Sequence, residues 1–162
     1  MELIAPDVYQ PRLKLLFKNY KKHILNLLPY ATVEHIGSSA ISNAYSKGDL
    51  DILISVSSQN FEVSIEKLKT LNFIEQQNTL RTHQLYMLVS EKKNEDVAFQ
   101  VVTDDSPYLC FLTFRNILNT HQHLVRDYNQ LKIACIHLPE DKYREIKSRF
   151  IEDVLHQYDV DD

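Results

Sequence analysis

Two segments decide the fold of this chain: Val33-Glu34-His35-Ile36-Gly37-Ser38-Ser39 and Lys47-Gly48-Asp49-Leu50-Asp51-Ile52-Leu53-Ile54. The first is a short apolar segment that ends in a Gly-Ser-Ser turn, and the second alternates acidic with aliphatic residues. Side chains two positions apart on a strand point to the same face of a sheet. The alternation therefore predicts an interior strand over 49–56 that presents Asp49 and Asp51 on one open face and buries Ile52 and Ile54.

The two aspartates predict a divalent metal site. Adjacent carboxylates make each other harder to ionise unless a cation lies between them. Mg²⁺ binds one or two carboxylates together with substrate phosphates, and Mn²⁺ accepts the same ligands. Gly37 lacks the Cβ that would hold a phosphate away from the backbone, and Ser38 and Ser39 can donate hydrogen bonds to phosphate oxygens. Together, the turn and the acidic strand predict a site for a metal and a phosphate.

The order hydrophobic-Gly-Ser, a spacer of about ten residues, then Asp-hydrophobic-Asp-hydrophobic resembles the signature of the nucleotidyltransferase superfamily. More narrowly, residues 37–47 are similar to the Gly-Ser-Thr…Gly-Leu…Lys-Pro segment of the GrpB family. The similarity continues in residues 112–118, which match a Phe-Arg-Asp-Tyr-Leu block, and in residues 128–134 and 143–151. The resemblance covers roughly residues 33–155.

The resemblance implies a nucleoside triphosphate bound through Mg²⁺ or Mn²⁺, and a nucleotidyl group transferred to an unidentified acceptor. In that chemistry Gly37, Ser38 and Ser39 would anchor the triphosphate, and Lys47 would neutralise part of its charge. Asp49 and Asp51 would hold the metal.

Position 100 departs from this pattern. A third acid normally lies mid-strand on the neighbouring strand, and the matching segment, residues 97–102, has Gln100 there. The GrpB family often carries His at this place. A neutral amide can orient a water but cannot act as a base at neutral pH, so Gln100 predicts binding without efficient transfer. Asp49, by contrast, favours metal binding, because many family members have an apolar residue at this position and keep only the second aspartate.

Two orientations stay open. The guanidinium of Arg115 can reach a phosphate of the nucleotide, or it can pair with an acid between a helix and the sheet. Glu34 and His35 are neighbours on the strand that enters the turn, so one of them faces the site.

The whole chain predicts an α+β fold: a nucleotidyltransferase-like mixed β-sheet with flanking helices and a C-terminal helical layer. Asn60 and Ser106 are expected to cap helices, and residues 159–162 are expected to be frayed. The predicted helices cover residues 9–28, 40–45, 61–71, 107–118, 123–135 and 139–158. The predicted strands cover residues 32–36, 49–56, 82–89 and 97–103, with another near 71–74 and a hairpin loop at 90–96.

Length and composition limit the class of protein. A chain of 162 residues is expected to form one domain, here residues 1–162. A net charge of -4 argues against a protein that coats nucleic acid. Cys110 and Cys135 are expected to be buried thiols of a reducing compartment. The sequence shows no long apolar run and no signal-peptide layout, which predicts a cytoplasmic protein without a membrane contact.

Three functions remain open from the sequence. The first is a metal-dependent nucleotidyltransferase. The second is a non-catalytic nucleotide-binding module that keeps the fold. The third is a regulatory or structural partner of another enzyme, for which the acidic charge and tail are suited.

Overall fold

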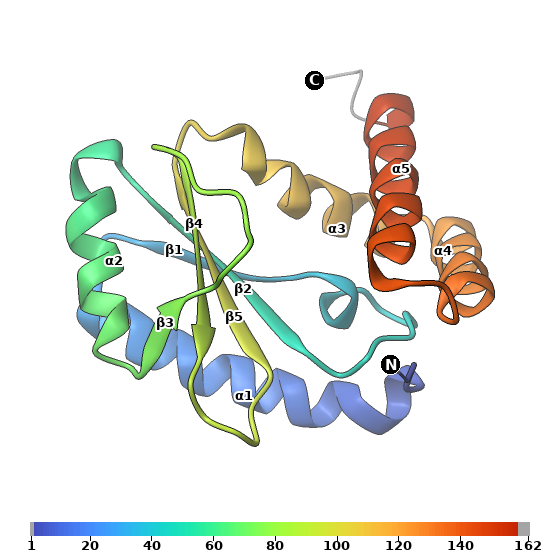
Figure 1. The fold of residues 1–162 in the computed structure, drawn as a ribbon, viewed down its shortest axis with the longest axis horizontal. Coiled ribbons are helices and arrows are strands. Elements are labelled where there is room, and N and C mark those ends of the chain that lie inside the picture. Colours follow the sequence, from blue (N-terminus) through green and yellow to red (C-terminus); the bar gives the residue numbers. More distant parts are fainter. Residues whose placement is uncertain (1, 159–162) are drawn as a thin grey trace.

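The computed structural model describes residues 2–158, which form an α+β fold (Figure 1). Within these residues, no helix combines the length and the apolar composition that crossing a membrane requires. The helices and strands, in chain order, are α1 (Pro6–Leu27), β1 (Thr32–Ile36), β2 (Leu50–Val56), α2 (Phe61–Lys69), β3 (Phe73–Glu75), β4 (Leu85–Ser90), β5 (Val97–Thr103), α3 (Cys110–Thr120), α4 (Gln122–Cys135) and α5 (Glu140–Tyr158).

The five strands form one mixed sheet in the order β1-β2-β5-β4-β3. Strands β2 and β5 are parallel, and the other neighbours are antiparallel. The acidic strand is therefore interior, as the alternation predicted. In the register, Ile36 lies beside Asp51, and Leu53 lies beside Gln100. Side chains that are cross-strand partners point to the same side, so Asp51 and Gln100 share one face of the sheet.

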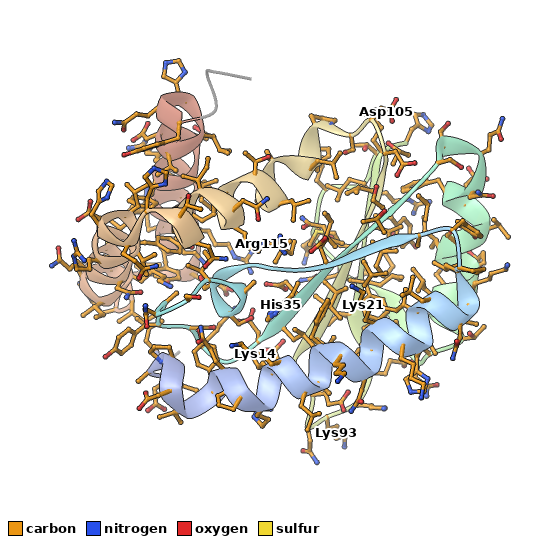
Figure 2. The ribbon with its side chains drawn as sticks, turned by 180° about the vertical axis from the view of Figure 1, so that it is seen from behind. Lys14, Lys21, His35, Lys93, Asp105 and Arg115 are labelled. Carbon is orange, nitrogen blue, oxygen red and sulfur yellow. The ribbon has the colours of Figure 1, made fainter. Side chains whose placement is uncertain are left out.

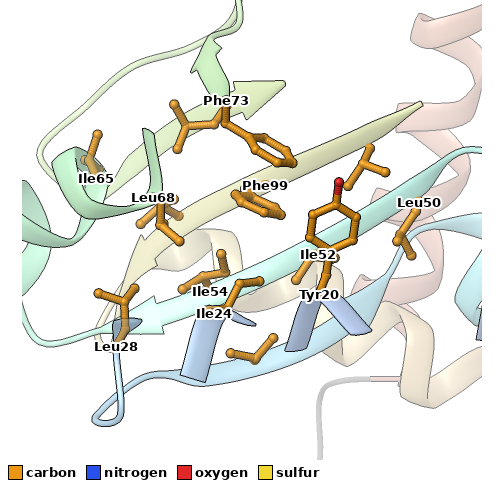
Figure 3. Packing of buried hydrophobic residues seen from close by; sticks show 14 of the residues in the cluster. Tyr20, Ile24, Leu28, Leu50, Ile52, Ile54, Ile65, Leu68, Phe73 and Phe99 are labelled. Carbon is orange, nitrogen blue, oxygen red and sulfur yellow. The ribbon is translucent and has the colours of Figure 1, made fainter. Parts of the chain in front are cut away.

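Helices α1 and α2 cover the opposite face and build the largest hydrophobic core (Figure 3). Its centre is the stacked pair Phe73 and Phe99, with 3.8 Å between ring centroids. Tyr20 from α1 meets Phe99 edge-on, and Ile52 and Ile54 of β2 are fully buried beside them. Burying these side chains fixes which way β2 and β5 face, because the side-chain period of a strand is two.

Helix α3 packs on the other face, over Ile36, Leu53, Leu85 and Val102. Helices α4 and α5 gather with α3 beyond one end of the sheet, near the start of β2 (Figure 1). This is the C-terminal helical layer that the sequence predicted.

The predicted helix over 40–45 is wrong. A single 3₁₀ turn, Ser38–Ala40, follows β1, and Asn43 then adopts a left-handed conformation with a φ of 66°. The backbone N–H groups of Ser42 and Tyr45 donate to the side chains of Asn119 and Asn129, at 2.8 and 2.9 Å. Helices α3 and α4 thus supply acceptors that an α-helix would have supplied from its own backbone.

Several predicted boundaries also differ, among them those of α2, which ends at Lys69 rather than residue 71, and α3, which spans Cys110–Thr120 rather than 107–118. Helix α1 begins at Pro6 rather than residue 9, because proline is well suited to a first helical position. Strand β2 begins at Leu50, so Asp49 lies just before it, and β4 begins at Leu85 rather than residue 82.

Of the two predicted caps, Ser106 is confirmed, whereas Asn60 stands at the N-cap position of α2 but its side chain makes no capping hydrogen bond. Ser106 Oγ accepts a hydrogen bond from the Tyr108 amide at 3.1 Å, whereas the Asn60 side chain donates to Ser57 Oγ. Cys110 and Cys135 are half-buried rather than buried. The predicted frayed end, residues 159–162, lies outside the described residues.

Candidate functional site

A cavity of about 210 Å³ opens between the Gly-Ser-Ser turn, the start of β2 and the three C-terminal helices. Its apolar lining includes Ile36, Met87, Phe111 and Phe114. The polar and small residues that line it are Gly37, Ser38, Ser46, Lys47, Asp49, Asp51, Gln100, Tyr128, Lys132, Tyr143 and Lys147. Six of the eight candidate residues from the sequence meet here, and two, Ser39 and Arg115, do not.

Asp49 and Asp51 line this cavity together, although each is half-buried rather than exposed. Ser46 Oγ donates to Asp49 Oδ1 at 3.4 Å, and Lys47 Nζ lies 4.0 Å from Asp49 Oδ2. Burial, with the negative charge of Asp49 as the second cause, raises the pKa of Asp51 to about 7. The two carboxylates therefore oppose each other's ionisation.

Gly37 is required by the position of Asp51. Its φ is +80°, and a Cβ placed on it would lie 2.7 Å from Asp51 Oδ2. Any other residue would push the carboxylate away or leave the turn strained. The next residue, Ser38, faces the cavity. Ser39 is buried, and its hydroxyl hydrogen-bonds to His35 Nε2 at 2.9 Å.

The open choice between Glu34 and His35 is resolved by the register of β1. Glu34 lies beside Leu53, on the face that carries Asp51. His35 lies on the other side of β1, stacked on Phe17 of α1 with 5.2 Å between ring centroids (Figure 2). Burial, assisted by the nearby Arg115 charge, lowers the pKa of His35 to about 4, so its ring is neutral at pH 7.

Arg115 ties α3 to β1. One of its guanidinium nitrogens donates to Glu34 Oε2 at 2.9 Å and to the His35 carbonyl at 2.8 Å. Its other nitrogens donate to the Asn116 side chain. The helix-to-sheet ion pair is thus the interpretation of Arg115 that matches the observed contacts.

Gln100 lies on β5 and points into the cavity that holds Asp51, as the sequence predicted. It is half-buried, and its side-chain amide makes no hydrogen bond with any group of residues 2–158. An unpartnered, half-buried amide in a cavity has donors and an acceptor available for a ligand.

Two lysines from the C-terminal helices complete the cavity. Lys132 is only 1% exposed, and its ammonium donates to Ser38 Oγ at 3.2 Å and to the Tyr45 carbonyl. Burial, with the charge of Lys147 as a smaller cause, lowers the pKa of Lys132 to about 7. Burial also lowers the pKa of Lys147, whose ammonium lies 5.3 Å from the centre of the Tyr143 ring. The cavity therefore has an acidic side and a basic side.

The fold and the sequence are similar to those of known proteins. The family model described as GrpB protein matches residues 5–157. The chain belongs to the GrpB family. A UPF0157 protein of Vibrio cholerae is 46% identical over 157 residues, which cover 97% of this chain and 83% of that protein. The crystal structure of the conserved protein GrpB from Enterococcus faecalis superposes with a TM-score of 0.78 at 20% identity, covering 97% of this chain and 99% of the other.

The GrpB fold is also similar to that of a nucleotidyltransferase. Cid1, an RNA terminal uridylyl transferase, matches with a TM-score of 0.56 at 13% identity. The match covers 81% of this chain but 40% of Cid1. At this identity the likeness concerns the fold, and it confirms the nucleotidyltransferase-like class predicted from the sequence.

Of the three lysines that line the cavity, Lys47 was predicted from the sequence, whereas Lys132 and Lys147 were not. A signal was present, because Tyr128…Lys132 and Tyr143…Lys147 repeat one pattern, Tyr-x-x-x-Lys, on successive helices. Residues four apart lie on the same helix face, and Lys132 Nζ lies 4.2 Å from the centre of the Tyr128 ring. The pattern indicates two tyrosine-lysine faces. Only the packing of α4 and α5 against the turn shows that both faces meet one cavity.

The donor set in this GrpB cavity fits a hard divalent cation that keeps waters and phosphate oxygens as ligands. Within residues 2–158, no cluster of three or more His, Cys, Asp or Glu side chains could hold a metal unaided. Asp49 and Asp51 supply two carboxylates, which is the usual number for Mg²⁺ bound together with a phosphate. Burial first, and the charge of Asp49 second, raise the pKa of Asp51, and a cation beside the two carboxylates would favour their ionised forms.

Proposed function

We propose that this GrpB protein binds a nucleoside triphosphate together with Mg²⁺ or Mn²⁺ in the cavity, and that it transfers a nucleotidyl group only slowly to hydroxyl acceptors. One observation carries the proposal: Asp49 and Asp51 share a cavity with Lys132 and Lys147. A carboxylate pair facing ammonium groups is complementary to a metal-bound polyphosphate.

In this proposal the basic side of the cavity binds the phosphates. Ser38 and the Gly37 backbone line the turn, and Lys132, already hydrogen-bonded to Ser38 Oγ, donates to phosphate oxygens. Lys47 and Lys147 add charge at the cavity wall. Ser39 and Arg115, predicted from the sequence to contact the nucleotide, make their side-chain hydrogen bonds within the fold instead.

Asp49 and Asp51 would hold the metal, which would supply positive charge to stabilise the charge that develops during transfer. Gln100 stands where a third acid would accept a proton from an attacking hydroxyl. General base catalysis is typically worth about 10²–10⁴-fold in rate, so transfer to a hydroxyl should be slow by about that factor.

Gln100 also favours a second candidate function, a non-catalytic nucleotide-binding or regulatory module. In that case the nucleotide and metal bind in the same way, but no product forms with any acceptor. Product formation, followed with a triphosphate labelled at the α-phosphate, separates the two candidates.

The test of binding is thermal unfolding of the full chain with nucleoside triphosphates, in Mg²⁺, in Mn²⁺ and in a chelator. We expect stabilisation that saturates with triphosphate and requires the metal, because a ligand that binds only the folded state raises its stability. The Asp49→Asn/Asp51→Asn double variant should lose this stabilisation.

The matched control for that variant is Asp105→Asn/Asp153→Asn, which removes two exposed carboxylates that do not line the cavity. It should respond to nucleotide and metal as the wild type does. Full metal-dependent stabilisation of the Asp49→Asn/Asp51→Asn variant would place the binding site elsewhere and contradict the proposal.

The lysines give a second test. Lys132→Met keeps the volume of the side chain but removes its charge, and each charge-assisted hydrogen bond to a phosphate is worth about 1.5–3 kcal/mol. Triphosphate affinity should therefore fall at least about tenfold, measured by calorimetry. The exposed Lys93→Met is the control and should bind as the wild type does. Unchanged affinity in Lys132→Met would exclude this lysine from the phosphate site.

A further inference from the structure

We propose that the second substrate of the cavity is an anionic oxygen nucleophile, namely a phosphate monoester or a carboxylate, and not a neutral hydroxyl. The proposal rests on the nucleotide binding proposed above and adds the chemical class of the acceptor. It is motivated by the Gln100 amide, the lack of a free carboxylate or imidazole base and the positive charge of the cavity.

The Gln100 amide can donate hydrogen bonds into the cavity. It projects from β5 on the face of Asp51, and it has no hydrogen-bond partner in residues 2–158. A carboxylate at this position would repel a second anion, whereas the N–H donors of an amide stabilise one. Gln100 thus suits an acceptor that arrives negatively charged.

The cavity offers a neutral hydroxyl no carboxylate or imidazole that is free to act as a base. Among the described residues that line it, the acids are Asp49 and Asp51, which the proposed function assigns to the metal, and none is a histidine. Lys132, whose pKa burial lowers to about 7, is assigned to the phosphates of the nucleotide. His35, the nearby histidine on β1, lies on the opposite face and stacks on Phe17. A phosphate or carboxylate oxygen needs no base, because it carries no proton to remove.

The charge of the lining favours more than one anion. Three lysines, Lys47, Lys132 and Lys147, face two aspartates, so the formal charge of the lining is positive before a metal binds. The Lys147 ammonium forms no ion pair within 4.0 Å among the described residues, although it feels the fields of both aspartates. An uncommitted cation of this kind can neutralise a second anion beside the triphosphate.

The reaction balances without a proton transfer. A lone pair of the anionic oxygen attacks the α-phosphorus of the nucleoside triphosphate and forms a new P–O bond. The bond from the α-phosphorus to the bridging oxygen breaks, and the electron pair leaves with pyrophosphate. A phosphate monoester yields a phosphoric anhydride, and a carboxylate yields a mixed acyl-phosphate anhydride.

The test measures binding of the second anion to the nucleotide-loaded protein. The full chain is saturated with Mg²⁺ and an α,β-methylene triphosphate, which occupies the phosphate site and cannot transfer its nucleotidyl group. Inorganic phosphate and acetate are then titrated separately at constant ionic strength, and binding is followed by calorimetry. The phosphate arm reports a phosphate-monoester acceptor, and the acetate arm reports a carboxylate acceptor.

We expect one of the two anions to bind the loaded wild type, and Gln100→Glu to weaken it at least about tenfold, because a like charge is added at contact distance. Mg²⁺–nucleotide binding by the same variant is measured first, and the anion is titrated only at concentrations that saturate the variant with nucleotide, so that a loss of the anion is distinguished from a loss of the nucleotide. Gln130→Glu adds the same charge at an exposed position of α4 and should leave anion affinity unchanged.

Two results with intact nucleotide binding would overturn this inference alone: neither anion binds the loaded wild type, or Gln100→Glu binds the anion as the wild type does. Failure of the wild type to bind any nucleotide is a different result. It overturns the proposed function, and this inference falls with it.

Discussion

Asp51 and Gly37 form a unit at the scale of single residues. The glycine adopts a left-handed conformation, and the absence of its Cβ leaves room for the Asp51 carboxylate. The carboxylate is in turn held beside Asp49 in a cavity that raises its pKa. The apo protein therefore keeps an electrostatically unfavourable pair in place, which is a common property of ligand sites.

The raised pKa of Asp51 predicts how the free energy of unfolding depends on pH when no metal is added. Its pKa rises from 3.8 when unfolded to about 7 in the folded protein, so between these values the folded state binds more protons than the unfolded state. The free energy of unfolding therefore falls as pH rises from about 4 to about 7, and the full cost remains at higher pH. Asp51→Asn should remove this cost and be more stable than the wild type at about pH 8, by roughly 1–3 kcal/mol.

Urea unfolding in a chelator, at about pH 4.5 and about pH 8, measures this difference. Asp105→Asn, an exposed substitution, should show no such gain at the higher pH. If Asp51→Asn were the less stable protein at the higher pH, the burial and repulsion assigned to Asp51 would be wrong.

Gly37 gives a second residue-scale prediction. Gly37→Ala and Gly48→Ala both place a Cβ at a positive φ, which costs roughly 1 kcal/mol or more in each case. At Gly37 the new Cβ also meets Asp51 Oδ2 at 2.7 Å, whereas at Gly48 it meets a methyl of Ile4 at 3.3 Å. Gly37→Ala should therefore lose more stability in urea unfolding and should also lose metal-dependent nucleotide binding, which Gly48→Ala should keep. Equal behaviour of the two variants would contradict the close packing of Gly37 on Asp51.

At the scale of elements, the hydrogen bonds from Arg115 on α3 to β1 allow a test of its two interpretations, a structural ion pair and a phosphate contact. Arg115→Ala removes hydrogen bonds to Glu34 and to the His35 carbonyl, so it should cost about 1–3 kcal/mol of stability. Nucleotide affinity should not change, because Arg115 does not line the cavity. Arg149→Ala breaks an exposed ion pair on α5 with Glu145 and should cost less than about 0.5 kcal/mol. Chemical unfolding and calorimetry measure both effects, and a loss of nucleotide affinity in a folded Arg115→Ala would favour the phosphate interpretation.

The elements also show where sequence reasoning succeeds. Strand β2 was predictable because its alternation of acids and aliphatics matches the period of a strand, and β5 because its apolar run is short and bounded. The helix over 40–45 was not predictable, because its alternative conformation depends on Asn119 and Asn129, far away in sequence. Local patterns carry no information on such long-range acceptors.

At the scale of the whole molecule, the site also contains residues that local sequence patterns predict and residues that only long-range packing brings in. The acidic pair, the turn and Gln100 are close in sequence or lie on neighbouring strands, so periodicity and sheet formation bring them together. Lys132 and Lys147 reach the cavity through the packing of α4 and α5 on α3. That packing is a tertiary property, and the Tyr-x-x-x-Lys pattern alone does not tell a ligand face from a solvated one.

The likeness to Cid1 has a limit at this scale. The match covers 40% of Cid1, so most of that enzyme lies outside the shared fold. The proposed class of acceptor therefore depends on the lining of the GrpB chain's own cavity, which includes Gln100 and three lysines.

The central claim is that one cavity holds both a divalent metal and the phosphates of a nucleotide. The most direct measurement is a crystal structure with Mn²⁺ and an α,β-methylene nucleoside triphosphate, with the metal located by its anomalous scattering. The account predicts an anomalous peak between the carboxylates of Asp49 and Asp51, with phosphate oxygens against Ser38 and Lys132. A manganese peak away from both aspartates, or a nucleotide bound outside this cavity, would contradict it.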